Sequence, residues 1–168
     1  MAIETAGQQK YADLTAKRIK SLQTGMIVWI SLLCLALISS FSNIILAAII
    51  GIVAVIYAIV NTKDRKAFNS KLDHIRDKDE FYRELTAPDA IELKKEQVLI
   101  ARDYVVAVDK DVQIYDLDHI KKAEIRQQSG KKTLILTDDK GRHHTIVSGS
   151  KNKKIDEACE IINTRVGI

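Results

Sequence analysis

Charged residues are absent from one long stretch of this chain, and that absence organises the rest of the sequence. Between Ser21 and Thr62 there is no Asp, Glu, Lys or Arg, although charged residues make up 29% of the 168 positions. Outside this stretch charge is dense and of both signs. Such a division predicts a membrane segment attached to one small domain.

Cysteine is also scarce, because the chain has only Cys34 in the apolar part and Cys159 near the C-terminus. Two cysteines in such different surroundings exclude a disulfide framework, and no spacing is typical of a zinc site. A Gly-rich phosphate loop and a G-x-S-x-G nucleophile motif are missing as well. We therefore expect no cofactor, no metal and no catalytic residues, and we favour a protein that is not an enzyme.

The net charge of +4 gives little reason to expect nucleic-acid binding. The first 20 residues have four basic and two acidic side chains, whereas residues 63–168 have 22 basic and 20 acidic ones. A nucleic-acid-binding domain usually has a dominant basic face. The nearly balanced charge of the larger part favours other partners.

Two apolar runs of 17 residues each, 25–41 and 44–60, lie inside the uncharged stretch. One continuous helix over that stretch would extend roughly 60 Å, about twice the thickness of a hydrocarbon core. The intervening SSFSN, residues 39–43, is typical of a turn, and Asn43 is suited to cap the second helix. We predict a two-span transmembrane hairpin over 24–61. A buried hairpin in a soluble protein is an alternative, and a cleaved signal peptide is disfavoured because a second apolar run follows at once.

Basic residues flank the hairpin on both outer sides, and its connecting loop has none. Because positive charge is retained on the cytoplasmic side, both termini are expected to face the cytoplasm of a multi-pass cell-membrane protein. Small residues around Gly51 predict close packing of the second span, either on the first span or in a homo-oligomer. The membrane-orienting residues are Lys17, Arg18, Lys20, Lys63, Arg65 and Lys66.

The remaining segments predict an α+β domain outside the membrane. Residues 1–23 are expected to form an N-terminal cytoplasmic helix or tail, and 62–88 a juxtamembrane helical stalk that ends before Pro88. From Ile91 the apolar period changes to two, and turn residues separate short strands of an antiparallel sheet. The last segment has helical spacing, with Ser148 or Ser150 as its N-cap. The strand segments are 97–101, 104–108, 111–116, 121–128, 132–138 and 143–148.

This order of segments resembles the bacterial pleckstrin-homology-like (PH-like) domains found on small membrane proteins. The resemblance covers roughly residues 91–168 and is carried by VLIARDYVVAV, VQIYDLDHIKKAEI, KTLILTDDKGRHHTIV and the closing helix. It implies a small curved sheet or barrel closed by a C-terminal helix and used for binding or assembly. Phosphoinositide-binding members have basic residues around the first strand connection. Only Arg102 beside Asp103 is expected there, so headgroup binding is not carried over.

One cluster of basic residues is a candidate binding surface on this domain. It surrounds the predicted hairpin of strands 121–128 and 132–138, where it can meet anionic lipid or an acidic partner. Solvated strand edges, on which lysine discourages pairing, are the alternative interpretation. The residues are Lys121, Lys122, Arg126, Lys131 and Lys132.

Two acidic or histidine-containing clusters are weaker candidates for metal binding. His143 and His144 follow Asp138 and Asp139, but consecutive strand residues point to opposite faces, so we expect a solvated hairpin. The aspartates between 109 and 118 lack the glycine and the closing glutamate of a calcium loop.

The sequence favours a membrane-anchored, non-enzymatic binding or scaffolding module that presents its domain to partners at the cytoplasmic membrane face. The expected partners are the lipid bilayer and another protein. An oligomerising hairpin that forms a pore or perturbs the bilayer is the alternative, and a membrane enzyme is a third hypothesis.

Overall fold

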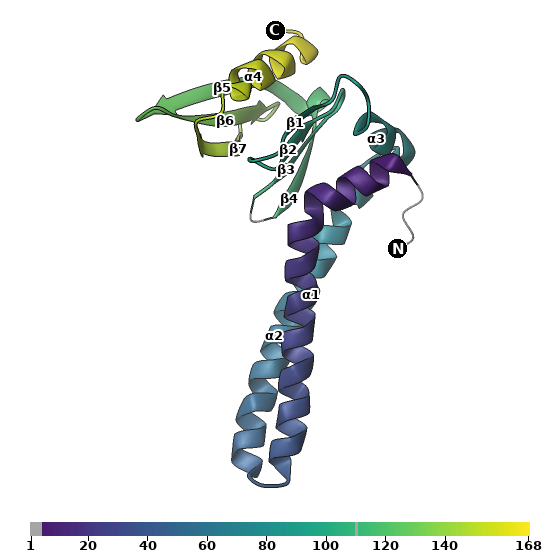
Figure 1. Ribbon diagram of the computed structural model, residues 1–168, viewed down its shortest axis with the longest axis vertical. Helices are drawn as coiled ribbons and strands as arrows, with labels where there is room; N and C mark the ends of the chain where they lie inside the picture. Colours follow the sequence, from purple (N-terminus) through teal and green to yellow (C-terminus); the bar gives the residue numbers. More distant parts are fainter. Residues whose placement is uncertain (1–4, 110) are drawn as a thin grey trace. The chain divides into compact units, whose positions relative to one another are not determined.

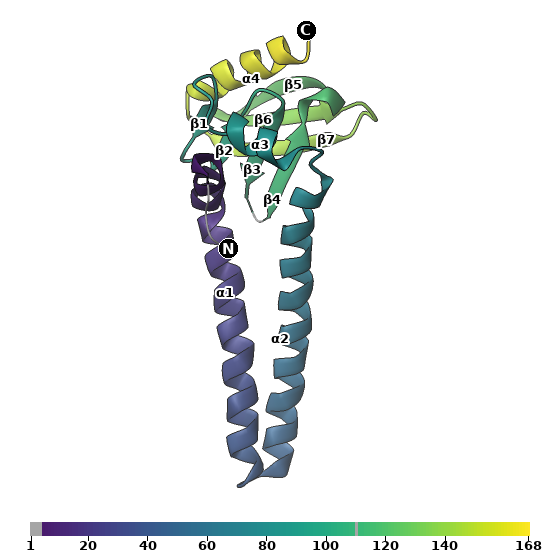
Figure 2. The same ribbon diagram turned by 90° about the vertical axis from the view of Figure 1, so that its right-hand side faces the viewer.

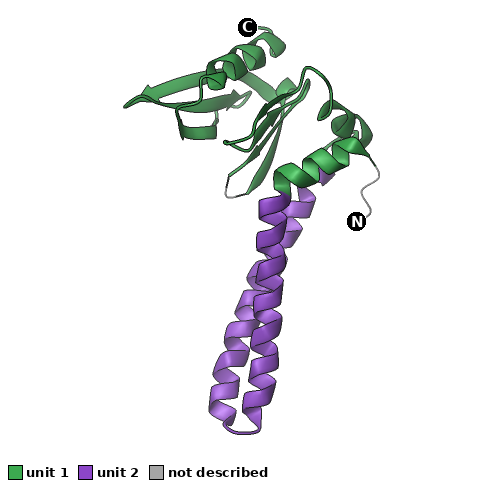
Figure 3. Ribbon diagram, in the orientation of Figure 1, with its two compact units in different colours: residues 1–15, 75–168 green, residues 16–74 purple. Residues whose placement is uncertain are grey.

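The computed structural model describes residues 5–109 and 111–168 of the chain. These residues form two compact units, one made of residues 16–74 and the other of residues 1–15 together with 75–168 (Figure 3). The boundary falls inside the first helix, α1 (Ala6–Ser40). The N-terminal segment therefore belongs to the same unit as the C-terminal domain, although the expected hairpin separates them in sequence.

The unit of residues 16–74 is a hairpin of two long helices. α1 continues to Ser40, and α2 (Ile44–Ser70) begins directly after a short turn at 41–43 (Figure 1). Asn43 caps α2, because its side-chain oxygen accepts hydrogen bonds from the backbone N–H groups of Ile45 and Leu46, each at 3.1 Å. The predicted turn and its cap are confirmed, although Ser39 and Ser40 belong to the helix.

Both helices are long and apolar enough to cross a membrane, which favours a membrane protein. Only 6% and 11% of the residues in their most apolar windows are buried within the described chain, so most of the apolar surface of the hairpin is exposed. The small-residue face packs within the hairpin, as predicted. Ala54 is fully buried, and a Cβ atom on Gly51 would contact the Cβ of Ala36 at 4.0 Å.

The predicted helical stalk over 62–88 is interrupted, and its expected continuity is wrong. α2 ends at Ser70, a 3₁₀ turn η1 (Leu72–His74) follows, and a separate helix α3 (Lys78–Glu84) begins after Asp77. The Asp77 carboxylate accepts hydrogen bonds from the backbone N–H groups of Asp79 and Glu80, both at 3.0 Å. An aspartate that caps a helix in this way starts a new helix rather than continuing the previous one.

Two antiparallel sheets make up the body of the second unit (Figure 2). Each strand pairs with its neighbour in sequence, so both sheets are simple meanders. The predicted strand segments are confirmed, and Ile91–Leu93 is an additional strand. No strand pairing joins the two sheets among the described residues, so the expected barrel is not closed. The first sheet contains β1 (Ile91–Leu93), β2 (Val98–Ile100), β3 (Tyr104–Val108) and β4 (Val112–Asp116); after η2 (Leu117–His119), the second contains β5 (Ile120–Gln128), β6 (Lys131–Asp138) and β7 (His143–Ser150).

The C-terminal helix α4 (Lys154–Arg165) completes the core that the two sheets share. Ile155, Ala158 and Ile162 are fully buried, which confirms the predicted apolar face. The predicted serine N-cap is wrong: Lys153 holds that position without a side-chain hydrogen bond, and Ser150 is the last residue of β7. The Ser150 hydroxyl donates to Glu96 and accepts from the backbone N–H of Asn152 at 3.1 Å, two residues before the helix begins.

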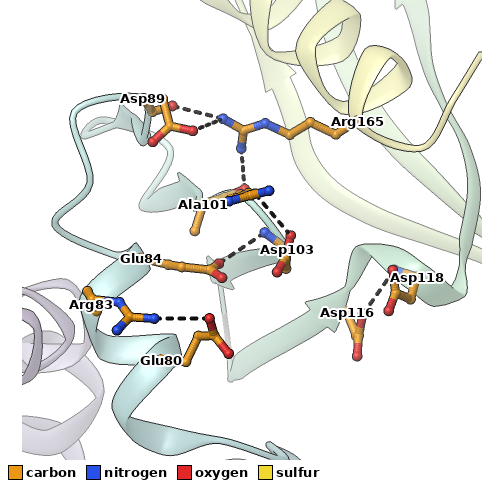
Figure 4. A network of polar contacts seen from close by, with 10 residues as sticks. Glu80, Arg83, Glu84, Asp89, Ala101, Asp103, Asp116, Asp118 and Arg165 are labelled. Carbon is orange, nitrogen blue, oxygen red and sulfur yellow. Dashed lines mark hydrogen bonds and ion pairs between the residues drawn. The ribbon is translucent and has the colours of Figure 1, made fainter.

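Arg165 links the end of α4 to the β2–β3 connection and to the segment that precedes β1 (Figure 4). Its guanidinium donates to the Ala101 carbonyl between β2 and β3, and to the backbone carbonyl (2.9 Å) and carboxylate (3.1 Å) of Asp89 before β1. Nearby, the Glu84 carboxylate at the end of α3 accepts a hydrogen bond from the backbone N–H of Asp103 at 3.0 Å. These contacts hold the β2–β3 connection from two sides.

The N-terminal turns of α1 pack on α3 through aromatic side chains. The ring of Tyr11 meets the rings of Phe81 and Tyr82 edge-on, with centroid distances of 5.9 and 6.1 Å. Phe81 in turn contacts Tyr104 on β3 at 5.3 Å. Edge-to-face pairs of this kind add to the apolar burial. Residues 6–15 are therefore part of the folded domain rather than a loose tail.

Candidate functional site

The predicted basic cluster lies on the hairpin of β5 and β6, but carboxylates already hold two of its members. Lys122 pairs with Glu124 on the same strand, and Lys132 pairs with Asp156 on α4. The hydrogen bond from Lys122 lowers the pKa of Glu124. Exposed ion pairs of this kind contribute little to stability, but they cancel much of the local positive charge.

The strand register divides the other members of this cluster. Lys122 and Arg126 lie on one face of β5, and Lys131, opposite Gln128, lies on the same face. Lys132 lies opposite Gln127 and therefore on the other face, toward α4. Lys121 stands at a register irregularity next to Ile120. Among the described residues no ion pair involves Lys121, Arg126 or Lys131. The cluster therefore keeps three uncompensated positive charges instead of the five that the sequence predicts.

Further lysines gather around a cavity of about 500 Å³ next to Ser150, which pairs with Lys132 at the same end of the second sheet as the β5–β6 turn. The cavity lies between the β1–β2 connection and the β7–α4 connection, and four lysines line it. Two acidic side chains, Glu92 and Glu96, also contribute. The lysines are Lys94, Lys95, Lys151 and Lys154.

Glu96 serves as a structural bridge across this cavity. Its carboxylate accepts hydrogen bonds from the Ser150 hydroxyl at 2.5 Å and from the Asn152 side-chain amide at 3.1 Å. Burial alone would raise the pKa of Glu96, but these hydrogen bonds outweigh it, and with Lys95 nearby they lower the pKa. The charge of Glu96 is thus engaged by the wall of the cavity, and four lysines remain in the lining against one other carboxylate, that of Glu92.

A second cavity of about 320 Å³ continues from the first along β7. The two cavities share Lys95, Glu96 and Ser150, and the second reaches residues 145–148 of β7 and Val108 at the end of β3. β7 is an edge strand, because within residues 5–109 and 111–168 only β6 pairs with it. We call this continuous opening between the sheets, bounded by Lys94–Glu96, 145–152 and Lys154, the lysine seam.

Sequence reasoning missed the lysine seam because it placed the first strand connection at Arg102–Asp103. The first connection is Lys94–Gln97, between β1 and β2, and it contains two lysines. Gln97 has a positive φ of 54°, a backbone conformation typical of tight turns. The residues KKEQ between two apolar positions are the signal that could have indicated this turn. Lys151 and Lys154 could not be placed beside them, because the sequence does not show that β7 ends next to β1.

The membrane-orienting residues all lie on the two helices of the hairpin unit. Arg18 on α1 and Asp64 on α2 form an ion pair at 3.5 Å, so the two basic flanks, Lys17–Lys20 and Lys63–Lys66, are neighbours at one end of the hairpin. This placement is the one that a two-span hairpin requires.

The histidine and aspartate cluster is a structural turn in the described part of the chain, and no group of three or more metal ligands is found there. Asp138 is buried, and its carboxylate accepts from the backbone N–H of Arg142 at 2.8 Å and from its guanidinium at 2.7 Å. His144 lies 3.1 Å from the same carboxylate, whereas His143 contacts Thr137, so the two histidines do point to opposite faces. The Asp116 carboxylate likewise accepts from the backbone N–H of Asp118 at 2.9 Å, as in a turn.

Comparison of the chain with protein-family models, with curated proteins and with solved structures finds no match.

Proposed function

We propose that this protein is a membrane-anchored, non-enzymatic binding module whose two-sheet domain takes up an acidic, extended segment of another membrane protein. In this proposal the hairpin spans the cell membrane twice, and both termini and the domain are cytoplasmic. The basic flanks at one end of the hairpin support that orientation, because the opposite end, at 41–43, carries no charge.

The lysine seam is the observation that carries this proposal. An edge strand exposes unpaired backbone N–H and C=O groups, to which an extended peptide can add as a further strand. Residues 145–148 of β7 line the second cavity, which shares Lys95 with the first cavity, and the four lysines of the first cavity favour acidic side chains. Anchoring in the membrane raises the effective concentration of the domain toward partners in the same membrane.

We further propose that residues 91–168 are a PH-like domain. Two antiparallel sheets of four and three strands, with one C-terminal helix across their core, support this relationship. A role in binding, as the resemblance implies, agrees with an open seam. The pore-forming alternative has less support, since 21–62 offers no charged side chain to line a channel.

Photocrosslinking in native membranes tests the binding surface. A photoreactive residue at the exposed position 148 on β7 is expected to capture a membrane protein, and one at the exposed position 160 on α4 is not. The double variant Lys95→Glu/Lys151→Glu is expected to abolish capture at position 148. The matched variant Lys121→Glu/Arg126→Glu, on β5, which is separated from β7 by β6, is expected to leave it unchanged. If the seam variant leaves capture unchanged and the variant on the basic hairpin abolishes it, the binding surface lies on β5 and β6 instead.

A further inference from the structure

A groove on the hairpin unit combines apolar lining with two lysines at one end. Its volume is about 330 Å³. Leu33 of α1 forms one wall, and the other lining residues all come from α2. These are Val55, Ala58, Ile59, Thr62, Lys63 and Lys66.

The α2 side of this groove changes from apolar to basic along a single stripe. Val55, Ile59, Thr62 and Lys66 are spaced at i, i+4, i+7 and i+11, so they lie on one face of the helix. At 1.5 Å per residue the stripe extends about 16 Å. A membrane lipid has the same order of chemistry over a similar length, from acyl chain through ester groups to phosphate.

The two lysines are available to a ligand. Among the described residues no ion pair involves Lys63 or Lys66, although Asp64 lies between them in sequence. Asp64 is directed instead to Arg18 of α1, at 3.5 Å. The ion pair between the helices therefore leaves the mouth of the groove with positive charge only.

We propose that this groove binds one anionic phospholipid molecule. An acyl chain lies against Leu33, Val55 and Ile59, and the lipid phosphate is held by Lys63 and Lys66. The inference rests on the proposed insertion of the hairpin in a membrane. Charge complementarity selects an anionic lipid over a zwitterionic one, because the amine of the latter offsets its phosphate. A bound lipid of this kind ties α2 to the leaflet on the side of the basic flanks.

Native mass spectrometry of the full chain tests this proposal. The protein is purified in detergent, mixed with equal amounts of phosphatidylglycerol and phosphatidylcholine, and examined for retained lipid. We expect one phosphatidylglycerol per chain. Each lysine at the membrane surface contributes about fivefold in binding, so Lys63→Gln/Lys66→Gln is expected to reduce retention roughly 25-fold. The matched pair Lys17→Gln/Lys20→Gln, on α1 outside the groove, is expected to retain the lipid.

A second variant separates the groove from simple surface charge. Ala58→Phe fills the apolar part while both lysines remain, and we expect it to remove the bound lipid. Equal retention of the two lipids, or an equal loss in the two lysine pairs, would overturn the inference. Conversion of a dimer to a monomer by Ala58→Phe would also overturn it, since a second copy would then be the occupant of the groove.

The failure of this inference differs from failure of the proposed function. If alkaline carbonate releases the chain from membranes, the hairpin does not span, and the proposed anchoring fails. If the chain stays in the membrane but shows no preference for phosphatidylglycerol, only the lipid inference fails.

Discussion

The carboxamide of Asn61 on α2 lies against Gly25 on α1, within 2.8 Å of the point that a Cβ atom on Gly25 would occupy. With its nitrogen facing α1, the amide donates to the Leu22 carbonyl at 3.2 Å, and its oxygen accepts from the Met26 backbone N–H at 3.1 Å. The glycine thus makes room for a polar contact between the helices at the basic end of the hairpin. Its hydrogen bonds join the two helices where the apolar run of α2 ends and the basic flank begins.

Replacing Asn61 by Leu is expected to weaken the hairpin without preventing its insertion. Interhelical hydrogen bonds in membranes contribute about 0.6 kcal/mol on average and up to about 1.7 kcal/mol. Denaturation in sodium dodecyl sulfate, followed by the fluorescence of the single tryptophan, Trp29, measures the difference. Asn69→Leu, an exposed position on the same helix, serves as the control. Equal effects of the two substitutions would contradict a specific role for Asn61.

Gly7→Ala is expected to detach the first turns of α1 from the domain. Alanine favours a helix over glycine by about 0.8–1.0 kcal/mol, but a Cβ here would lie 1.8 Å from the backbone oxygen of Tyr82. A backbone atom cannot move aside as a side-chain end can, and overpacking costs about 1–3 kcal/mol, so destabilisation wins. Hydrogen exchange of residues 6–15 measures the loss. Ala6→Ser, at the neighbouring exposed position, should change little, and unchanged protection in Gly7→Ala would contradict this packing.

The sequence predicted those parts of the fold that depend on local pattern. Six strands follow from apolar alternation and their turns, and the turn at 41–43 follows from the polar residues that separate two apolar runs. The capping role of Asn43 was predictable because side-chain acceptors at that position serve the backbone donors two and three residues ahead.

Long-range packing explains what the sequence could not predict. The docking of residues 6–15 depends on Tyr11 meeting Phe81, and nothing near Tyr11 in sequence indicates a partner 70 positions away. The apolar period over the predicted stalk, 62–88, indicated a single helix, but Asp77 ends that continuity by capping α3. The basic cluster on β5 and β6 could be predicted because its residues lie close together in the sequence. Its partial neutralisation by Asp156 was not, because that contact requires α4 to lie beside β6.

The ionised carboxylate of Asp138 is expected to stabilise the domain at neutral pH but not in acid. Burial would raise the pKa of Asp138, but hydrogen bonds from His144 and Arg142 outweigh burial and hold its pKa well below the usual range. A depressed carboxyl pKa contributes stability above the unfolded value of about 4, and this stability is lost as pH falls below it. Asp138→Asn is therefore expected to be less stable than the wild type at pH 7, with the difference shrinking below pH 4. Thermal unfolding across pH measures it, and Asp139→Asn, at the exposed neighbour, is the control. A difference independent of pH would contradict the role of the charge.

Glu84 is expected to show the opposite behaviour. It is only 7% exposed, and its pKa is raised chiefly by burial, which outweighs the hydrogen bond from the Asp103 backbone N–H. A raised carboxyl pKa contributes stability at acid pH, and this stability is lost as pH rises through the folded-state value. Glu84→Gln keeps an acceptor for Asp103 and removes the buried charge, so it should stabilise the domain at pH 7 but not at pH 3. The exposed Glu80→Gln is the control, and a stability loss at pH 7 in Glu84→Gln would contradict burial as the dominant effect.

The orientation of the hairpin leads to the last prediction. Ser42 lies in the uncharged turn and Ala67 beyond the basic flank of α2, so the two should be on opposite sides of the membrane. In a Cys34→Ala background, Ser42→Cys is expected to react with a membrane-impermeant maleimide in intact cells. Ala67→Cys should react only after the cells are permeabilised, because the positively charged flank stays in the cytoplasm. Substituting Lys63, Arg65 and Lys66 by Gln removes half of that bias and should weaken the asymmetry of labelling. Reaction of both cysteines in intact cells would exclude the two-span arrangement, whereas a reversed pattern would keep the hairpin and invert its direction.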